Sequence, residues 1–328
     1  MATYKAEFLS HYWEGRLRPR SAYAFGLVPW WARAAGLAPR LANFFTQTPG
    51  LASLARAAAG MAPERKIPAF APRTFRNWFE SRVPRPEFRS PVLLFPDTFT
   101  NFFQPDIAHA AVEVLEAAGF RVTIPERVLC CGRPLYDYGM LGLARKTLKR
   151  VLAALREEIR NGIPVVVLEP SCAAVFKDEL PALFPDDEDA RRLSEQTHVL
   201  AELLRRKAPG FRPPPLARAA ILQGHCHQKA LFTMADEEEI LEQMGITLES
   251  LDSGCCGMAG SFGFERGDHY DVSIKCGERV LLPRIRQAPG DTLIVADGFS
   301  CREQIRQGTG REALHLAEVL LLAMREGC

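Results

Sequence analysis

Residues Gly254-Cys-Cys-Gly-Met-Ala-Gly-Ser-Phe-Gly263 are the clearest guide to the fold, because their Cys-Cys-Gly core occurs a second time at Cys130-Cys-Gly132. Other segments pair in the same order along the chain: residues 219–222 with 92–95, 240–246 with 114–120, 279–281 with 150–152, 300–301 with 171–172, and 316–320 with 200–204. Chance does not place six similar pairs in register. The region from residue 91 to residue 328 is therefore an internal duplication.

Each half of the duplication alternates short apolar runs with amphipathic segments. Residues 91–95, 121–124 and 165–168 are typical of strands, whereas residues 106–118 and 140–160 have helical periodicity. Strands that alternate with helices indicate a mostly parallel sheet covered on both faces. We therefore predict an α/β protein with two internally duplicated Rossmann-like halves, each with a parallel sheet, preceded by a short α-helical N-terminal arm.

The first 88 residues differ from the duplicated region. Prolines at positions 19, 29, 39, 49 and 63 separate short apolar segments, which predicts several short helices joined by turns. Residues 68–91 carry many prolines and little periodicity, and we interpret them as a linker. The predicted organisation is a helical arm and linker over residues 1–88, a first repeat over 89–210, and a second repeat over 211–328.

Composition and charge exclude several classes of protein. The chain has 41 basic and 39 acidic residues, so a net charge of +2 argues against nucleic-acid binding. An apolar fraction of 47% indicates a folded chain, and no apolar run reaches the roughly 20 residues of a membrane span. The N-terminus has no signal-peptide pattern, and we expect a cytoplasmic protein. The aromatic and basic arm leaves peripheral association with the inner face of the membrane as an alternative, although its scattered arginines favour packing on another domain.

Nine cysteines in such a protein indicate metal ligands or redox thiols more than structural disulfides. In the second half, Cys226 follows one strand, Cys255 and Cys256 follow the next, and Cys301 follows the third. The carboxyl ends of parallel strands meet at one edge of a sheet, so we expect these four thiols to converge. A vicinal pair chelates a single zinc poorly, and an iron–sulfur cluster fits the four thiolates better.

The first half repeats only part of this pattern. Cys130, Cys131 and Cys172 match three of the four cysteines, but Thr98 occupies the position of Cys226. A hydroxyl is a poor ligand for a soft metal, and we predict a degenerate or altered second site here unless Asp97 or a group from the other half contributes. Cys276, within a helix expected over residues 271–285, and the terminal Cys328 are interpreted as inert.

Two histidines, His225 and His227, flank Cys226 and are accessory candidates as ligands, as hydrogen-bond donors to sulfur, or, with Lys229, in binding an anionic substrate. Two other chemistries remain open for the cysteines. One is a zinc-bearing assembly module without redox activity, and the other is a thiol–disulfide oxidoreductase that acts through a vicinal pair.

The motifs His225-Cys-His-Gln-Lys-Ala230, Ser253-Gly-Cys-Cys-Gly-Met-Ala-Gly260 and Asp297-Gly-Phe-Ser-Cys-Arg302 resemble the cysteine-rich (CCG) domain family. That family includes the B subunit of heterodisulfide reductase and the iron–sulfur subunits of glycolate oxidase, anaerobic glycerol-3-phosphate dehydrogenase and lactate utilisation systems. The resemblance is strongest to the C-terminal region of bacterial FAD-linked oxidases with iron–sulfur clusters, and it extends to the N-terminal residues Met1-Ala-Thr-Tyr-Lys-Ala-Glu-Phe-Leu9.

The resemblance implies an oxidoreductase component that carries an iron–sulfur cluster, of the 4Fe–4S type, on Cys226, Cys255, Cys256 and Cys301. It also implies an FAD-linked 2-hydroxyacid dehydrogenase of the glycolate or D-lactate type, with FAD and ferredoxin-type clusters on a partner or on a further domain. Two family features are missing. Cys301 and Cys172 are not followed by the second cysteine of a Cys-x-x-Cys motif, which puts disulfide reduction in doubt, and the sequence contains no ferredoxin motif or flavin-binding segment.

Overall fold

Two parallel sheets lie at the centre of the molecule in the computed structural model, which describes residues 2–83 and 90–326. The first sheet has the order β2-β1-β3-β4, with β1 (Ser90–Phe95), β2 (Phe120–Thr123), β3 (Val165–Val167) and β4 (Thr197–His198). The second has the order β6-β5-β7, with β5 (Ala219–Leu222), β6 (Thr247–Ser250) and β7 (Leu293–Val295). All strand pairs are parallel, and the order β2-β1-β3 recurs as β6-β5-β7. The predicted α/β class with two parallel sheets is confirmed.

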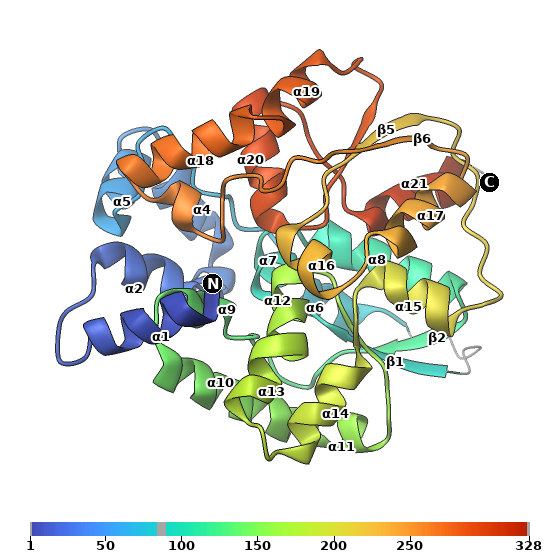
Figure 1. Ribbon diagram of the computed structural model, residues 1–328, viewed down its shortest axis with the longest axis horizontal. Helices are drawn as coiled ribbons and strands as arrows, with labels where there is room; N and C mark the ends of the chain where they lie inside the picture. The colour runs from blue at the N-terminus through green and yellow to red at the C-terminus, as the bar shows by residue number, and fades with distance from the viewer. Residues whose placement is uncertain (1, 84–89, 327–328) are drawn as a thin grey trace.

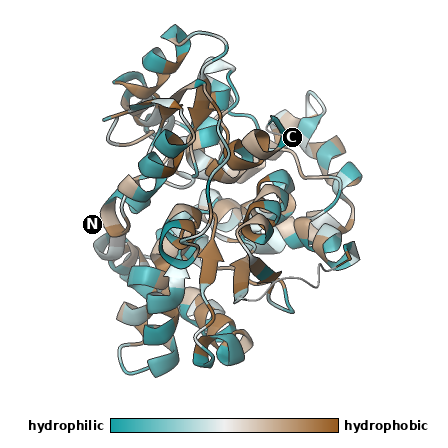
Figure 2. Ribbon diagram, turned by 90° about the vertical axis from the view of Figure 1, so that its right-hand side faces the viewer, coloured by the Kyte–Doolittle hydropathy of each residue, from teal (hydrophilic) through white to brown (hydrophobic). Residues whose placement is uncertain are grey.

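Helices cover both sheets (Figure 1). Those of the first half are α7 (Thr98–Phe102), α8 (Pro105–Ala117), α9 (Arg133–Asp137), α10 (Leu141–Ala154), α11 (Arg156–Arg160), α12 (Pro170–Ala174), a π-helical turn (Val175–Glu179), α13 (Leu180–Leu183), α14 (Glu188–Gln196) and α15 (Leu200–Lys207). Those of the second half are α16 (Cys226–Leu231), α17 (Ala235–Gln243), a 3-10 turn (Phe262–Phe264), α18 (Asp268–Glu278), α19 (Leu281–Gln287), α20 (Phe299–Thr309) and α21 (Leu316–Glu326). The central strands are apolar and the outer helices carry the polar residues (Figure 2).

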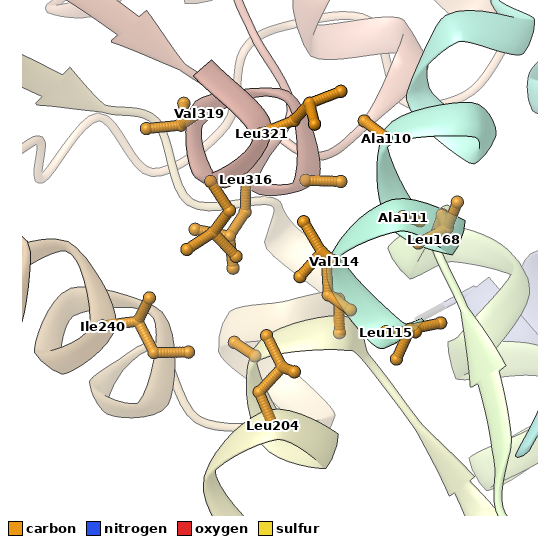
Figure 3. Packing of buried hydrophobic residues seen from close by; sticks show 14 of the residues in the cluster. Ala110, Ala111, Val114, Leu115, Leu168, Leu204, Ile240, Leu316, Val319 and Leu321 are labelled. Atoms are coloured by element: carbon orange, nitrogen blue, oxygen red, sulfur yellow. The ribbon is translucent and has the colours of Figure 1, made fainter. Parts of the chain in front are cut away.

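The two halves share one hydrophobic core. Figure 3 shows α8 of the first half beside α21 of the second, with Val114 and Leu316 between them and Leu115 and Val319 in the same cluster. The same cluster includes residues of β1, a strand of the first sheet, and of β5, a strand of the second sheet. Apolar burial is the main stabilising term in folding, so this common core fixes the two sheets, and the loops at their edges, relative to each other.

The N-terminal arm contains α1 (Ala2–Tyr12), α2 (Arg20–Gly26), α3 (Val28–Leu37), α4 (Pro39–Gln47) and α5 (Leu51–Ala59). It packs on the first half through α9, α10 and α7. Arg18 and Arg33 also donate hydrogen bonds to the carbonyl oxygens of Gly139 (3.0 Å) and Val128 (2.7 Å). The arm is therefore packed on the rest of the protein, which is the arrangement that the scattered distribution of its arginines favoured. Most of the exposed large apolar side chains of the described residues nevertheless belong to it, including Tyr4, Phe8 and Trp31.

Three sequence predictions need correction. Residues 68–91 are not only a linker, because α6 (Phe75–Ser81) lies within them and Phe75 is completely buried in the common core. The predicted helix over residues 140–160 is interrupted at Leu155, and a single helix over 271–285 is interrupted between α18 and α19. Pro283 explains the second break, because proline is accepted only in the first turn of a helix.

Two predictions lie outside the described residues: the boundary between residues 88 and 89, and the terminal Cys328. Within the described residues, no helix is both long and apolar enough to cross a membrane.

Candidate metal centre

The four cysteines of the second half come from the carboxyl ends of three neighbouring strands. Cys226 begins α16 after β5, Cys255 and Cys256 lie in the loop after β6, and Cys301 lies in the first turn of α20 after β7. Because β5 is the central strand of the order β6-β5-β7, the loops after β6 and β7 flank the one that carries Cys226. The predicted convergence is therefore present in the fold.

The thiols of this group interact in a chain. Cys255 is hydrogen-bonded to Cys226 and to Cys256, and Cys256 is also hydrogen-bonded to Cys301. The hydrogen bond with Cys255, together with burial, raises the pKa of the Cys226 thiol. The hydrogen bonds with Cys255 and Cys301, together with burial, raise the pKa of the Cys256 thiol. Several thiolates this close repel one another unless a cation neutralises them. The donor set thus fits a soft metal centre, which supplies that positive charge.

The turn that presents Cys255 and Cys256 requires small residues. Gly257 has φ +93°, and a Cβ atom there would overlap the carbonyl oxygen of Ser273 and lie 3.1 Å from the Cβ of Cys276. Ala259 has φ +41°, a conformation that alanine rarely adopts, and it stands alone among the described non-glycine residues in having a positive φ. The close approach of α18 therefore explains the glycine-rich sequence around the pair.

His225 and His227 stack on each other, with ring centroids 5.3 Å apart. His225 Nδ1 accepts a hydrogen bond from the backbone N–H of His227 (3.2 Å), and the potential ligand atoms of His225, Cys226 and His227 lie within 4.8 Å of one another. Burial lowers the pKa of both rings to about 4, so both are neutral at pH 7. His227 Nδ1 is buried without a hydrogen-bond partner among the described residues, which keeps it free to ligate or to bond to sulfur.

The first half forms a smaller group at the matching positions. Cys130 and Cys131 follow β2, and Cys172 lies in α12 after β3, with 2.6 Å between the sulfur atoms of Cys131 and Cys172. Thr98 begins α7 after β1 and its side chain is hydrogen-bonded to Cys130. The structure therefore brings together all three predicted cysteines of this half, with Thr98 in the fourth position.

Both groups face one cavity of about 450 Å³ between the two halves and the arm. Six of the seven cysteines in the two groups line it, and the seventh, Cys301, is 2% exposed and bonded to Cys256. The helices that carry Cys172 and Cys226, α12 and α16, pack directly on each other (Figure 1). Cys276 does not line this cavity and is partly exposed, and its interpretation as inert stays a prediction.

Sequence reasoning missed Glu169, which joins the two groups. Its Oε1 accepts hydrogen bonds from the backbone N–H and hydroxyl of Ser171, and its Oε2 accepts one from the backbone N–H of Phe299 in the other half (2.8 Å). Phe299 also stacks on Phe99 of the first half, with centroids 4.3 Å apart. Comparison of the two repeats could have pointed to Glu169, because its counterpart in the second half is Gly298 and the two halves therefore differ here. At Gly298 a side chain is excluded, since a Cβ would overlap the His225 ring.

Replacing this buried carboxylate gives the first testable prediction. Glu169→Gln has one oxygen instead of two, so either Ser171 or Phe299 loses an acceptor. We expect a loss of about 1–3 kcal/mol of unfolding free energy, measured as a lower thermal midpoint by circular dichroism. The exposed Glu157→Gln is the matched control, and an equal midpoint for both variants would show that the bond to Phe299 contributes nothing.

These features define a duplicated α/β protein that presents thiols at the strand ends of both sheets. The family model for the CCG cysteine-rich domain matches the chain twice, over residues 96–177 and 224–306, and each match contains one cysteine group. The two matches together cover half of the chain. The chain therefore belongs to the CCG cysteine-rich domain family, and both the predicted resemblance and the predicted duplication are confirmed.

Curated relatives include larger enzymes and separate subunits. The C subunit of anaerobic glycerol-3-phosphate dehydrogenase of Escherichia coli is 28% identical over 87% of this chain and 72% of its own length. Lactate utilization protein A of Bacillus velezensis is 30% identical over 70% of this chain and 98% of that protein. D-2-hydroxyglutarate dehydrogenase of Escherichia coli is 24% identical over 97% of this chain, which spans only 32% of that enzyme.

Proposed function

We propose that the chain is the iron–sulfur electron-transfer module of an FAD-linked 2-hydroxyacid dehydrogenase of the glycolate or D-lactate type. It passes electrons from the flavin of a partner to a downstream acceptor, as one component of an oxidoreductase. The observation that carries this proposal is the convergence of four interacting thiols at the ends of β5, β6 and β7.

In this proposal Cys226, Cys255, Cys256 and Cys301 hold a 4Fe–4S cluster. Such a cluster, when bound, accepts and releases single electrons. The protein contributes a fixed set of donors, because Cys256 and Cys301 are buried and the turn around Gly257 packs against α18, whereas Cys226 is exposed on the cavity side. His225 and His227, both neutral, provide a buried imidazole nitrogen next to sulfur that tunes the site.

The names of the relatives support the substrate class. Two of them act on or support the use of hydroxy acids, D-2-hydroxyglutarate and lactate, whereas the third is a component of a glycerol-3-phosphate dehydrogenase. The first two agree with the 2-hydroxyacid class, and we propose that class for this chain.

The partner follows from the lengths of the matches. Nearly all of this chain, arm included, aligns with about a third of D-2-hydroxyglutarate dehydrogenase, so most of that enzyme lies outside the match. We propose that a flavoprotein with FAD and ferredoxin-type clusters supplies the equivalent region here. Clustered cysteines that serve as metal ligands are typical of a reducing compartment, and we propose the cytoplasm, with peripheral contact to the inner face of the membrane as the alternative.

Metal analysis of anaerobically purified, reconstituted protein tests this function. We expect a brown protein that absorbs near about 400 nm and carries at least about four irons and four sulfides per chain. Cys255→Ser should lose the irons and sulfides held by the second half, because it removes the thiol that links Cys226 to Cys256. The matched control Cys276→Ser should retain them.

Two outcomes contradict the proposal. A colourless protein with about one zinc per chain, at a site of thiolates, would make this a non-redox assembly module. A metal-free protein in which Cys255 and Cys256 react readily with thiol reagents would instead indicate a thiol–disulfide oxidoreductase.

A further inference from the structure

The two cysteine groups differ at one position, which decides how many ligands each can provide. Thr98 and Cys226 both begin the helix that follows the central strand of their sheet, β1 or β5. Thr98 is 6% exposed, lines the shared cavity and is hydrogen-bonded to Cys130. Its side chain thus stands where the second half has a ligand, but a neutral hydroxyl does not replace a thiolate on iron.

The carboxylates beside Thr98 are already occupied. Asp97 caps α7: its Oδ1 accepts hydrogen bonds from the backbone N–H groups of Phe99 (2.7 Å) and Thr100 (3.1 Å), and its Oδ2 accepts one from the Thr100 hydroxyl (2.6 Å). Both oxygens of Glu169 are likewise engaged, by Ser171 and Phe299. Turning either carboxylate toward a metal would leave buried N–H groups without acceptors, which costs about 1–3 kcal/mol for each group.

The histidines of the other half are grouped with Cys226 and not with the first-half cysteines. His225 and His227 lie with Cys226, within the 4.8 Å group of the second half, and the Nδ1 atom of His225 is engaged by the backbone of His227. Asp137, the remaining carboxylate at the cavity, accepts hydrogen bonds from Arg133 at Oδ1. Among the described residues, the first-half group itself therefore offers three thiolates. Each iron of a cubane cluster needs one terminal ligand from the protein, and three thiolates match three irons.

We propose, on the basis of the function above, that Cys130, Cys131 and Cys172 hold a three-iron 3Fe–4S cluster, with Thr98 closing the position of the fourth iron. The chain then carries two different clusters that face one cavity, and a single side chain, Thr98 in place of cysteine, sets the difference. The proposal concerns cluster composition and is independent of substrate turnover.

The test converts the site with Thr98→Cys and uses Thr98→Ser, which keeps the hydroxyl, as the matched control. For the unaltered, reconstituted chain we expect about seven irons and eight sulfides. We also expect an electron paramagnetic resonance signal in the oxidised state, because three ferric ions leave an unpaired electron. Thr98→Cys should raise the iron content by about one per chain and remove that signal, and Thr98→Ser should change neither.

Failure of this inference is distinguishable from failure of the proposed function. If the unaltered chain holds only the irons that Cys255→Ser removes, or if Thr98→Cys leaves iron content and signal unchanged, the three-iron site is wrong and the second-half cluster stands. The three-iron site is equally wrong if eight irons are already present without the substitution, or if the first half holds zinc. A chain without any iron overturns both proposals.

Discussion

A Gly257→Ala variant is expected to lose the second-half metal centre and about 3–5 kcal/mol of unfolding free energy. Two effects add at this position. First, the backbone has φ +93°, a conformation that residues with a Cβ rarely adopt. Second, the added Cβ overlaps the carbonyl oxygen of Ser273 in the middle of α18. The overlap is with backbone, so a side-chain rotation cannot relieve it. The turn that carries Cys255 and Cys256 must move away from α18.

The chain contains matched controls for this variant. Gly254, in the same turn, has φ +67°, and an added Cβ there would meet nothing within 4 Å, while at Gly132, the counterpart of Gly257, it would meet its nearest neighbour at 3.8 Å. Alanine at either position should cost only about 1–2 kcal/mol, from the backbone conformation alone. In a protein of this size we expect a decrease in thermal midpoint of roughly 4–7 °C for Gly257→Ala and about 1–3 °C for the controls.

Iron content distinguishes packing from conformational strain. Gly254→Ala and Gly132→Ala should bind iron like the unaltered chain after reconstitution, whereas Gly257→Ala should lose the irons that Cys255→Ser loses. If Gly257→Ala matches Gly254→Ala in both midpoint and iron content, then the close packing of this turn against α18 has no role in the centre.

Much of the fold follows from local patterns in the sequence. The strands at 90–95, 120–123 and 165–167 are predictable to within one or two residues, because a buried parallel strand is a short apolar run whatever it packs against. The convergence of Cys226, Cys255, Cys256 and Cys301 follows from topology alone, because parallel strands end at one edge. Their role as ligands stays a prediction.

The missed features depend on contacts between distant segments. Phe75 is completely buried, but only because α6 packs on α7 and α8, and proline-rich flanking sequence gives no sign of it. The packing of α8 on α21 joins the halves into one core, whereas comparison of the repeats treats each half separately. Glu169 was missed for the same reason: its function depends on a backbone N–H in the other half.

Arg65 is one of the contacts between the N-terminal region and the second half, next to the backbone hydrogen bonds of Ala62 with Phe264 and of Arg266 with Gly60. The Arg65 side chain is 2% exposed and donates hydrogen bonds from Nε to the carbonyl oxygen of Gly263 (2.8 Å) and from Nη2 to the hydroxyl of Ser273 (3.1 Å). The guanidinium also lies 5.1 Å from the ring centroid of Tyr270. Its two acceptors belong to the glycine-rich segment, which contains Gly257, and to α18, against which Gly257 packs, so Arg65 joins these two elements.

An Arg65→Met variant is therefore expected to weaken both the fold and the metal centre. Methionine keeps much of the length of the side chain but leaves two buried, neutral acceptors without this donor. We expect a loss of about 2–4 kcal/mol of unfolding free energy, or a thermal midpoint lower by roughly 3–6 °C. The neighbouring Lys66→Met, at an exposed side chain, should stay within about 0.5 kcal/mol of the unaltered chain. Because the damage reaches α18 and the turn, Arg65→Met should also release iron from the second-half centre faster when a chelator is added, while Lys66→Met should not. Equal midpoints and equal release rates for the two variants would show that the arm is only a cover and does not support the centre.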